Sequence, residues 1–326
     1  IKFFTSEELS TINAPNPSNV VLNEIGTPSV AEAACMIAAG QGSKLLKEKK
    51  IFKSIDSSKS TFGAVTIAVS ESKNQYSPLT GEIHVVGSGP GDISYLTNDA
   101  RKALSKCSIW IGYKMYLDLI KPLKRKDQVL IESNLTEERE RCEKAIKLAE
   151  EGIKIALISS GDSGFYGMAG LLLELIQKVN KDFRPSFEVH PGISSMQLAA
   201  ALGGAPLMND FCSISLSDKL TPWESIEKRI AGALLGDFVI AFFNPQSLGR
   251  NWQLKRAIEL CLQYRLGNTP VLVGRQVGRE NQSKSFFTLD SMPLKDIDML
   301  SIIIIGNSKT TLIDEIFLTP RGYLKK

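Results

Sequence analysis

The chain has 326 residues, of which 43% are hydrophobic and 23% charged, and its formal net charge is +4. These values are typical of a folded globular protein and exclude a disordered chain. No block of five or more like charges occurs. We therefore expect no nucleic-acid partner, whereas an anionic small molecule is compatible with the modest positive charge.

The five cysteines are widely spaced and lack a C-x-x-C pair. Their spacing argues against a disulfide framework, a zinc site and an iron–sulfur cluster, and it indicates a reducing, cytoplasmic compartment. No apolar run approaches the roughly 18–20 residues of a membrane span, so we expect no membrane contact. The first residue is Ile1, and residues 1–4 look like a strand, so the chain is predicted to be a piece of a longer product.

Residues 1–70 are predicted to form a small α/β domain. Its expected elements are an apolar stretch at residues 20–22, a helix that opens at residues 27–29 and continues through Ala39, and a strand at residues 65–69. The polar segment that follows, residues 71–80, is rich in Ser, Asn, Gln and Pro-containing turn signals and is predicted as a linker.

Strands and helices then alternate through residues 81–205. The strands read as nearly continuous apolar runs, which predicts a parallel sheet covered by helices on both faces. The expected strands are 82–87, 108–112, 128–131, 153–158 and 186–190, and the expected helices are 97–106, 114–120, 136–151, 164–179 and 192–202.

A second α/β domain is predicted for residues 206–326. The strands are expected at 212–216, 237–243, 269–274 and 301–306, with helices at 222–234 and 251–265.

The turn after the strand at 82–87 reads Gly87-Ser88-Gly89-Pro90-Gly91-Asp92 and has almost no side chains. Its bare backbone amides are available to a ligand, although a turn of this composition can also serve only as a turn. It departs from the dinucleotide-binding pattern because Pro90 fixes φ and removes one amide.

Other turns at the same edge are rich in glycine and small hydroxyls. Residues 159–167 contain Asp162, and residues 190–195 contain Ser194 and Ser195. These side chains suit hydrogen bonds to a ligand and also suit helix capping, and both interpretations stay open. Because ligands bind at the carboxyl ends of parallel strands, the turns together predict a binding site there.

Other chemistry-bearing residues are less informative. His84 and His190 are interpreted as structural residues, and no metal site is expected. Lys114, near the end of the strand at 108–112, could hold a carboxylate or lie on a solvated helix face. The sequence contains no catalytic-triad spacing, no H-E-x-x-H and no P-loop, so hydrolase, zinc-peptidase and nucleotide-hydrolysing functions lose their usual support.

Residues from about 82 to 323 resemble the tetrapyrrole methylases, the S-adenosylmethionine-dependent methyltransferases of corrin and sirohaem synthesis. The motifs that carry the resemblance are residues 87–92 with Leu96-Thr97, 111–117, 161–167, 191–195, 200–207, 210–218, 243–247 with Arg250, and 306–308. The runs at 112–117 and 214–218 are most similar to the branch that methylates precorrin-3B at C17 with ring contraction. Residues 1–70 resemble the C-terminal domain of cobalt-precorrin-5A hydrolase, through residues 26–34 and 65–69.

The resemblance implies a fold of two α/β domains with the methyl-donor site in the cleft between them, preceded by the small domain. It implies a precorrin substrate, a homodimer and contact with neighbouring corrin-pathway enzymes. The donor contacts that it implies are Pro90, Gly161, Asp162, Ser163, Ser194, Ser195, Ile214 and Leu216.

The ring contraction requires a proton to move, and Asp92 is our candidate to position or deprotonate the substrate. The substrate carries many carboxylates, and the candidate clamps for them are Lys114, Arg250, Arg275 and Arg279. Two alternatives stay open: a methyltransferase of the same fold with another acceptor, such as a diphthine intermediate or ribosomal RNA, and a non-catalytic module that binds corrin intermediates. A dinucleotide-dependent oxidoreductase is disfavoured because no acidic residue ends a strand about 20 residues beyond the glycines.

Overall fold

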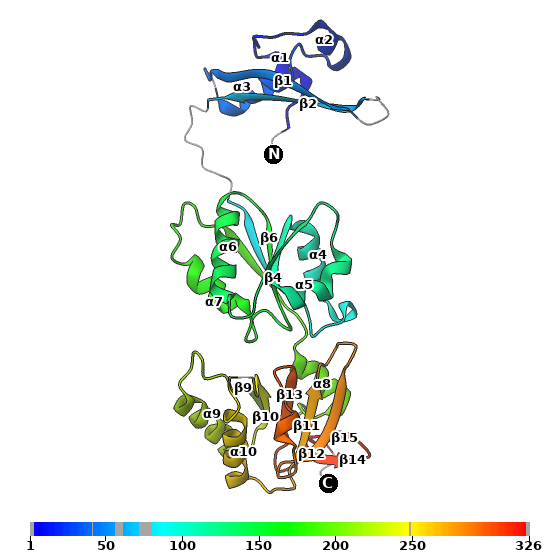
Figure 1. The fold of residues 1–326 in the computed structure, drawn as a ribbon, viewed down its shortest axis with the longest axis vertical. Coiled ribbons are helices and arrows are strands. Elements are labelled where there is room, and N and C mark those ends of the chain that lie inside the picture. Colours follow the sequence, from blue (N-terminus) through cyan, green and yellow to red (C-terminus); the bar gives the residue numbers. More distant parts are fainter. Residues whose placement is uncertain (1–2, 41, 56–60, 72–79, 248, 324–326) are drawn as a thin grey trace. The chain divides into compact units, whose positions relative to one another are not determined.

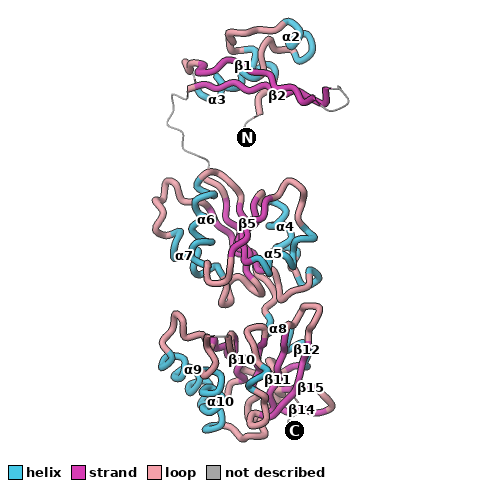
Figure 2. The backbone as a smooth tube through the Cα atoms, viewed as in Figure 1, coloured by secondary structure: helices cyan, strands magenta, loops and turns pink. Residues whose placement is uncertain are grey.

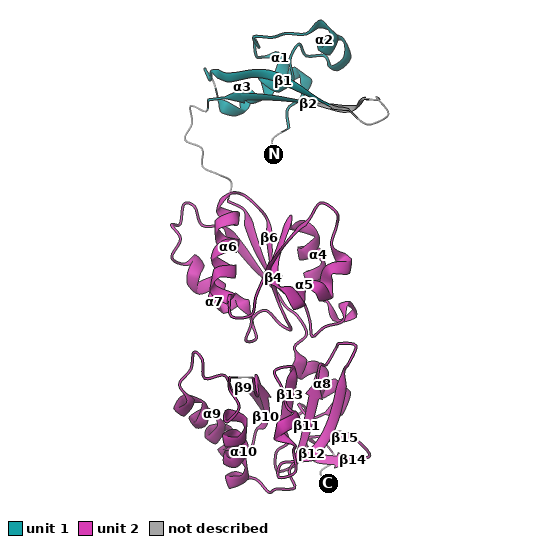
Figure 3. Cartoon of the chain, viewed as in Figure 1, with its two compact units in different colours: residues 1–77 teal, residues 78–326 magenta. Residues whose placement is uncertain are grey.

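The computed structural model of the chain describes residues 3–40, 42–55, 61–71, 80–247 and 249–323 (Figure 1). The chain divides into two compact units, residues 1–77 and residues 78–326 (Figure 3). Residues 72–79 of the predicted linker and residues 1–2 of the predicted first strand lie outside the described residues. Residues 3–4 precede the first helix and are not in a strand, so the prediction is wrong for them.

The first unit packs one helix, at residues 31–39, against an antiparallel hairpin (Figure 2). The helices are α1 (Ser6–Ser10), α2 (Asn19–Ile25) and α3 (Ala31–Ala39), and the strands are β1 (Leu45–Ile55) and β2 (Thr61–Ser70). The predicted helix is present and ends at Ala39 as expected, but it begins at Ala31 and not at residues 27–29. The predicted strand at 65–69 is confirmed as part of β2. Strand β1 was not predicted, because lysines interrupt its apolar residues.

Glu32 in α3 is a buried carboxylate that ties the unit together. It accepts hydrogen bonds from the Asn16 amide nitrogen Nδ2 and from the Lys49 backbone N–H, both at 2.9 Å. Burial by itself would raise the pKa of Glu32, but the hydrogen bonds from Lys49 and Asn16 outweigh it and lower the pKa below its ordinary value of 4.5.

We expect Glu32→Gln to destabilise the first unit by about 1–2 kcal/mol at pH 7, because hydrogen bonds to an ionised group are lost. A lowered carboxyl pKa contributes stability above the ordinary value of 4.5, and the contribution is lost as the pH falls further, through the folded-state pKa. The deficit of the variant should therefore shrink below about pH 4.5. Hydrogen exchange of first-unit peptides in the full chain measures it, with the exposed Glu24→Gln as control; an equal deficit at pH 7 and pH 3 would contradict the assignment.

The second unit begins with a five-stranded sheet in which every neighbouring pair is parallel. Its strand order is β5 (Val129–Ser133), β4 (Ile109–Tyr113), β6 (Ile155–Ser159), β3 (Glu82–Gly87) and β7 (Ser186–His190). Helices α4 (Asn98–Lys106) and α5 (Lys114–Ile120) cover one face, and α6 (Glu138–Glu150) and α7 (Met168–Ile176) cover the other (Figure 1). The predicted parallel sheet with helices on both faces is confirmed.

The second sheet of this unit is mixed. Its order is β12 (Ser283–Thr288), β11 (Pro270–Arg275), β13 (Ser301–Ile305), β10 (Val239–Phe243) and β9 (Phe211–Ser215). Only β9 and β10 are parallel neighbours among these strands. Helices α9 (Trp223–Leu235) and α10 (Gln253–Tyr264) pack into one apolar core with the sheet, and α8 (Ser195–Gly203) packs into another. The four predicted strands and both predicted helices are present, and β12 was missed because its first half is polar.

A small three-stranded sheet, β14 (Thr311–Ile313), β15 (Ile316–Leu318) and β8 (Gly204–Ala205), joins the start and end of this half. Three short 3-10 turns complete the described elements: η1 (Ile93–Tyr95), η2 (Lys121–Leu123) and η3 (Leu294–Asp296). Within the described part of the chain, none of the helices has both the length and the apolar character needed to cross a membrane.

Candidate functional site

Three loops meet at the carboxyl ends of β3, β6 and β7. Gly89 N–H donates to the Gly161 carbonyl at 3.1 Å, and Gly161 N–H donates back to the Gly89 carbonyl at 2.8 Å. A Cβ on Gly192 would lie 2.1 Å from the Gly161 carbonyl oxygen, and one on Gly87 would lie 2.7 Å from the Gly192 nitrogen. These glycines are therefore required so that the three loops can pack backbone against backbone.

Asp162 fixes two of these loops. Its Oδ1 accepts from the Gly164 N–H and its Oδ2 accepts from the Gly192 N–H, both at 2.9 Å. Helix α7 begins at Met168 with Gly167 as its N-cap, so Asp162 does not cap that helix. Ser194 does cap its helix: it forms a capping box with Gln197 at the start of α8.

An open pocket of about 180 Å³ lies beside these loops. It has more than ten times the volume of roughly 10–15 Å³ that one water needs, so it has room for a small molecule. The loops of both sheets contribute to its lining, which consists of Pro90, Tyr116, Ser160, Gly161, Asp162, Phe165, Tyr166, Ser194, Ser195, Phe243, Asn244, Gln276, Val277, Arg279, Met299, Leu300 and Ser301.

Aromatic side chains form one wall of the pocket. The ring centroids of Phe165, Tyr166 and Phe243 lie 5.2 Å from one another. The Tyr166 hydroxyl donates to the Ser213 carbonyl at 3.0 Å, which connects the loop after β6 to β9 of the second sheet. This wall joins the two halves of the second unit.

The glycine turn also contacts the loop after β11. Asp92 N–H donates to the Gly278 carbonyl, and a Cβ on Gly91 would lie 2.3 Å from that same oxygen. The next residue, Arg279, lines the pocket, and its Nε donates to the Pro90 carbonyl at 3.4 Å. A guanidinium is therefore held at the pocket beside Pro90.

Among the described residues, six of the predicted site residues line the pocket: Pro90, Gly161, Asp162, Ser194, Ser195 and Arg279. Ser163, Ile214 and Leu216 are buried outside the lining. The Ser163 hydroxyl donates to the His190 carbonyl at 3.0 Å, and the other two side chains belong to the core of the second sheet. Their assignment as donor contacts stays a prediction.

The remaining predicted cations have partners within the protein. Lys114 is exposed and pairs with Asp118 and Glu132 at 3.4 and 3.3 Å. Arg275 pairs with Asp298 at 2.7 Å.

Arg250 is buried, and it donates to the carbonyls of Leu216 and Pro245, which connects the loops after β9 and β10. None of these three cations is in the described pocket lining, and their role as substrate clamps stays a prediction.

Asp92 caps the 3-10 turn η1: its Oδ1 accepts from the Ser94 N–H at 2.7 Å. This hydrogen bond from Ser94 lowers the pKa of Asp92 below its usual range. A carboxylate with a lowered pKa is a weaker base, and Asp92 is outside the described pocket lining. Its role in proton transfer stays a prediction.

Sequence reasoning missed the lining residues that follow β11 and those just before and at the start of β13, namely Gln276, Val277, Met299, Leu300 and Ser301. The polar turn at Gly274-Arg275 is a partial signal for these residues in the sequence. In the structure this turn continues through Gln276, which has a left-handed φ of 49°. Both segments lie at the same edge of the mixed sheet because β11 and β13 are antiparallel.

Comparison with known proteins agrees with this architecture. Residues 82–293 match the family model described as tetrapyrrole (corrin/porphyrin) methylases, and residues 1–70 match the model described as cobalamin synthesis G C-terminus. The chain belongs to the tetrapyrrole methylases, and the predicted resemblance is confirmed.

The relatives narrow the family to one branch. The chain is 46% identical over 241 residues to the probable cobalt-factor III C(17)-methyltransferase of Salmonella typhimurium, covering 74% of this chain and 99% of the relative. It is 36% identical over 251 residues to the precorrin-3B C(17)-methyltransferase of a Sinorhizobium species, covering 75% and 98%. The crystal structure of the methyltransferase CobJ superposes with a TM-score of 0.70 at 33% identity, covering 74% of this chain and 100% of that one.

Proposed function

We propose that this chain transfers a methyl group from S-adenosylmethionine to C17 of precorrin-3B or its cobalt form, with ring contraction, in cobalamin biosynthesis. The observation that carries the proposal is the pocket at the carboxyl ends of the parallel strands, where three glycine loops meet Arg279 and an aromatic wall. Family membership and the C17-methyltransferase relatives support it. The 46% identical relative is named for cobalt-factor III, so we propose the cobalt form as the first substrate to test.

We propose that the donor contacts Pro90, Gly161, Asp162, Ser194 and Ser195. The glycines leave no Cβ at the surface of these loops, so a ligand can approach the backbone closely. The N–H groups of Gly89, Gly161, Gly164 and Gly192 already donate within the loops, so the bare amides expected from the sequence are occupied at these positions. When bound, S-adenosylmethionine supplies an electrophilic methyl group on a sulfonium cation, and the faces of Phe165, Tyr166 and Phe243 suit a cation. Ser163, Ile214 and Leu216 are retained as further proposed contacts.

The protein's contribution to the transfer is orientation. In an in-line displacement the positive charge of the donor disappears, so the site needs to align the two reactants and exclude water rather than supply a strong nucleophile. A pocket built from rigid backbone loops, with two of them held by Asp162, fits this requirement.

Arg279 is the cation that we propose for the substrate carboxylates, ahead of Lys114, Arg250 and Arg275. We expect Arg279→Gln to raise KM for the pigment about tenfold, because one charge-assisted hydrogen bond is lost, and to leave the dissociation constant of the donor unchanged. Steady-state kinetics and donor titration measure both constants. Lys114→Gln is the matched control, since Lys114 lies outside the described lining and should change KM less than twofold; equal effects of the two variants would contradict the assignment.

The activity itself is tested by anaerobic incubation of the full chain with methyl-labelled S-adenosylmethionine and either pigment, followed by mass spectrometry. One added labelled methyl with ring contraction is the expected result, and the pigment that reacts identifies the form of the substrate. Donor binding without transfer to either pigment would favour another acceptor or a non-catalytic corrin-binding module. No donor binding would overturn the methyltransferase proposal.

The finer organisation is also proposed. We infer a cytoplasmic homodimer that contacts neighbouring corrin-pathway enzymes, with residues 71–80 as the linker from residues 1–70 to two methylase domains. The sequence-based bounds of these domains are 81–205 and 206–326, but α8 shares its apolar core with the second sheet, so we assign α8 to the second domain. Analytical ultracentrifugation of the purified chain tests the dimer: a single monomeric species at micromolar concentration would contradict it.

A further inference from the structure

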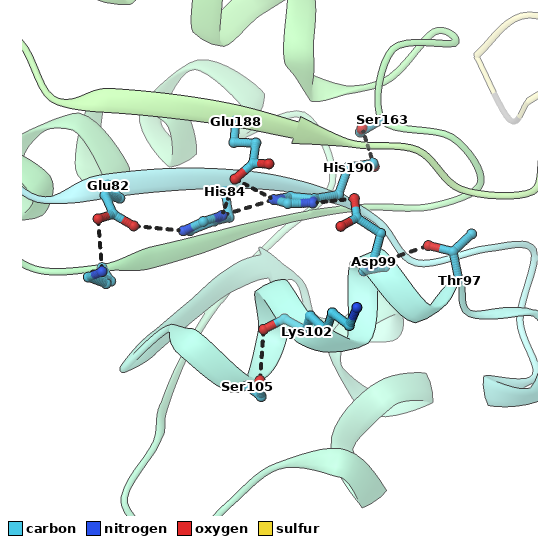
Figure 4. Close-up of polar contacts among 11 residues, drawn as sticks. Glu82, His84, Thr97, Asp99, Lys102, Ser105, Ser163, Glu188 and His190 are labelled. Carbon is cyan, nitrogen blue, oxygen red and sulfur yellow. Dashed lines mark hydrogen bonds and ion pairs between the residues drawn. The ribbon is translucent and has the colours of Figure 1, made fainter.

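Two buried histidines face each other on the parallel sheet, on the side that α4 covers (Figure 4). His84 Nδ1 lies 2.9 Å from His190 Nε2. The register of β3 and β7 aligns His84 with Glu188 and Val86 with His190, so that His84, Glu188 and His190 share one face. In the sequence, each histidine by itself was interpreted as structural. The strand register brings the two histidines together with Glu188 as a cluster.

The outer nitrogen of each ring faces a carboxylate. His84 Nε2 lies 3.2 Å from Glu82 Oε2, and His190 Nδ1 lies 2.7 Å from Asp99 Oδ2. A carboxylate oxygen that accepts a hydrogen bond needs a donor opposite it, so the tautomer that fits these contacts has N–H at the two outer nitrogens. The two inner nitrogens then present lone pairs to each other at 2.9 Å. Such a contact is favourable only with a cation between them, either a proton or a metal ion.

A third possible ligand atom, a carboxylate oxygen, favours a metal ion over a shared proton. Glu188 Oε2 lies 3.6 Å from His84 Nδ1 and 3.7 Å from His190 Nε2. The point equidistant from these three atoms is about 2.0 Å from each, which is within the usual range of zinc–nitrogen and zinc–oxygen bonds. A shared proton would use only the two nitrogens, whereas imidazoles backed by carboxylates and joined by a third ligand are the usual surroundings of a bound metal.

We propose that His84, Glu188 and His190 bind a divalent transition-metal ion of the zinc type. Imidazole and carboxylate together suit Zn²⁺, Co²⁺ or Ni²⁺ better than Mg²⁺ or Ca²⁺. Glu82 and Asp99 orient the two rings, and Lys154 Nζ in turn pairs with Glu82 at 2.8 Å. Zn²⁺ is the probe for the site.

The cluster is accessible to an ion. A hollow beside it is lined by Glu82, His84, Ser186, Phe187 and Glu188, and the Glu188 side chain is 61% exposed. Water can therefore complete the coordination shell from that side.

The position of the cluster indicates what a bound metal would do. His190 ends β7 and is followed by Pro191 and Gly192 of the pocket loop. The Ser163 hydroxyl donates to the His190 carbonyl at 3.0 Å, and the Thr97 hydroxyl donates to the Pro191 carbonyl at 3.1 Å. A metal on His190 would hold the end of β7 against β3 and so position the loop. Metal binding can be measured without methyl transfer, so this inference stands apart from the proposed function.

The test is equilibrium dialysis of the full chain, freed of metal with a chelator, against buffered Zn²⁺, with metal analysis of the protein. We expect one Zn²⁺ per chain, and at least about tenfold weaker binding in Glu188→Gln and in the double variant His84→Gln, His190→Gln. Glu174→Gln, at an exposed glutamate of α7, should bind as the unchanged chain does. Because Glu188 is exposed, its variant should keep the circular dichroism and apo melting temperature of the unchanged chain.

Cobalt(II) substitution adds a spectroscopic readout. The expected visible spectrum is that of a site with nitrogen and oxygen ligands, without a thiolate charge-transfer band, and it should be lost in Glu188→Gln. A thiolate band, Zn²⁺ uptake that is equal in all variants, or no Zn²⁺ uptake by the unchanged chain would each overturn the proposal. In the last case, a proton shared by the two histidines would account for the 2.9 Å contact.

Discussion

Replacing Gly192 by alanine should disrupt the packing of the three pocket loops. The added Cβ would lie 2.1 Å from the Gly161 carbonyl oxygen and 2.8 Å from the Gly87 carbonyl oxygen. Both neighbours are backbone atoms, so no flexible side chain can move aside. The loops must therefore separate, and we expect the free energy of unfolding to fall by about 1–3 kcal/mol.

The rate of methyl transfer should also fall steeply in Gly192→Ala. A displacement of about 1 Å in groups that align reactants can cost roughly 100-fold in rate, and we expect a loss of that size in kcat. Denaturant unfolding and single-turnover methylation measure the two effects. Gly170→Ala is the control, because a Cβ there meets nothing within 4 Å and alanine is the better helix former. Wild-type stability and turnover in Gly192→Ala would show that the three loops are not packed as described.

Asp162→Asn is expected to separate two of the loops without any steric clash. The carboxylate accepts from Gly164 and from Gly192 with its two oxygens. The amide of asparagine keeps one acceptor and turns an N–H donor toward the other N–H. Since a hydrogen bond to a charged group contributes about 1.5–3 kcal/mol, we expect donor affinity to fall about 10- to 100-fold.

Calorimetric titration with S-adenosylhomocysteine measures the affinity, and hydrogen exchange of the backbone amides of residues 161–164 and 192 reports the loop itself. Faster exchange at both places should accompany the weaker binding. Asp182→Asn, at an exposed loop aspartate, is the matched control and should leave both measurements unchanged. If Asp162→Asn lowered affinity with exchange unaltered, Asp162 would act through the ligand alone and not by holding the loops.

The sequence predicted the parallel sheet because strands buried on both faces read as apolar runs with helical periods between them. It failed at β1 and β12, where lysine and serine replace part of the apolar pattern. Strands of this kind are exposed on one side or lie at an edge, and tertiary pairing overrides their weak local signal.

For the site, the sequence identified the loops that surround the pocket but not which of the predicted charged residues line it. Glycine and small hydroxyls after three strands predicted a site at their carboxyl ends, because parallel strands end at one edge. The structure has a pocket beside these loops. The charges were harder to assign: Lys114, Arg250 and Arg275 have the right chemistry, but their partners within the protein come from distant segments. Only Arg279 among the four predicted cations lines the described pocket.

The sequence by itself determined the family, the parallel sheet and the loops of the pocket, since these depend on local composition and short motifs. The tertiary structure alone decided which residues meet. His84 and His190 are 106 positions apart, and only the register of β3 and β7 places them 2.9 Å from each other. Strand order and register are properties of the whole sheet, set by the burial of every strand at once, and a single motif does not encode them.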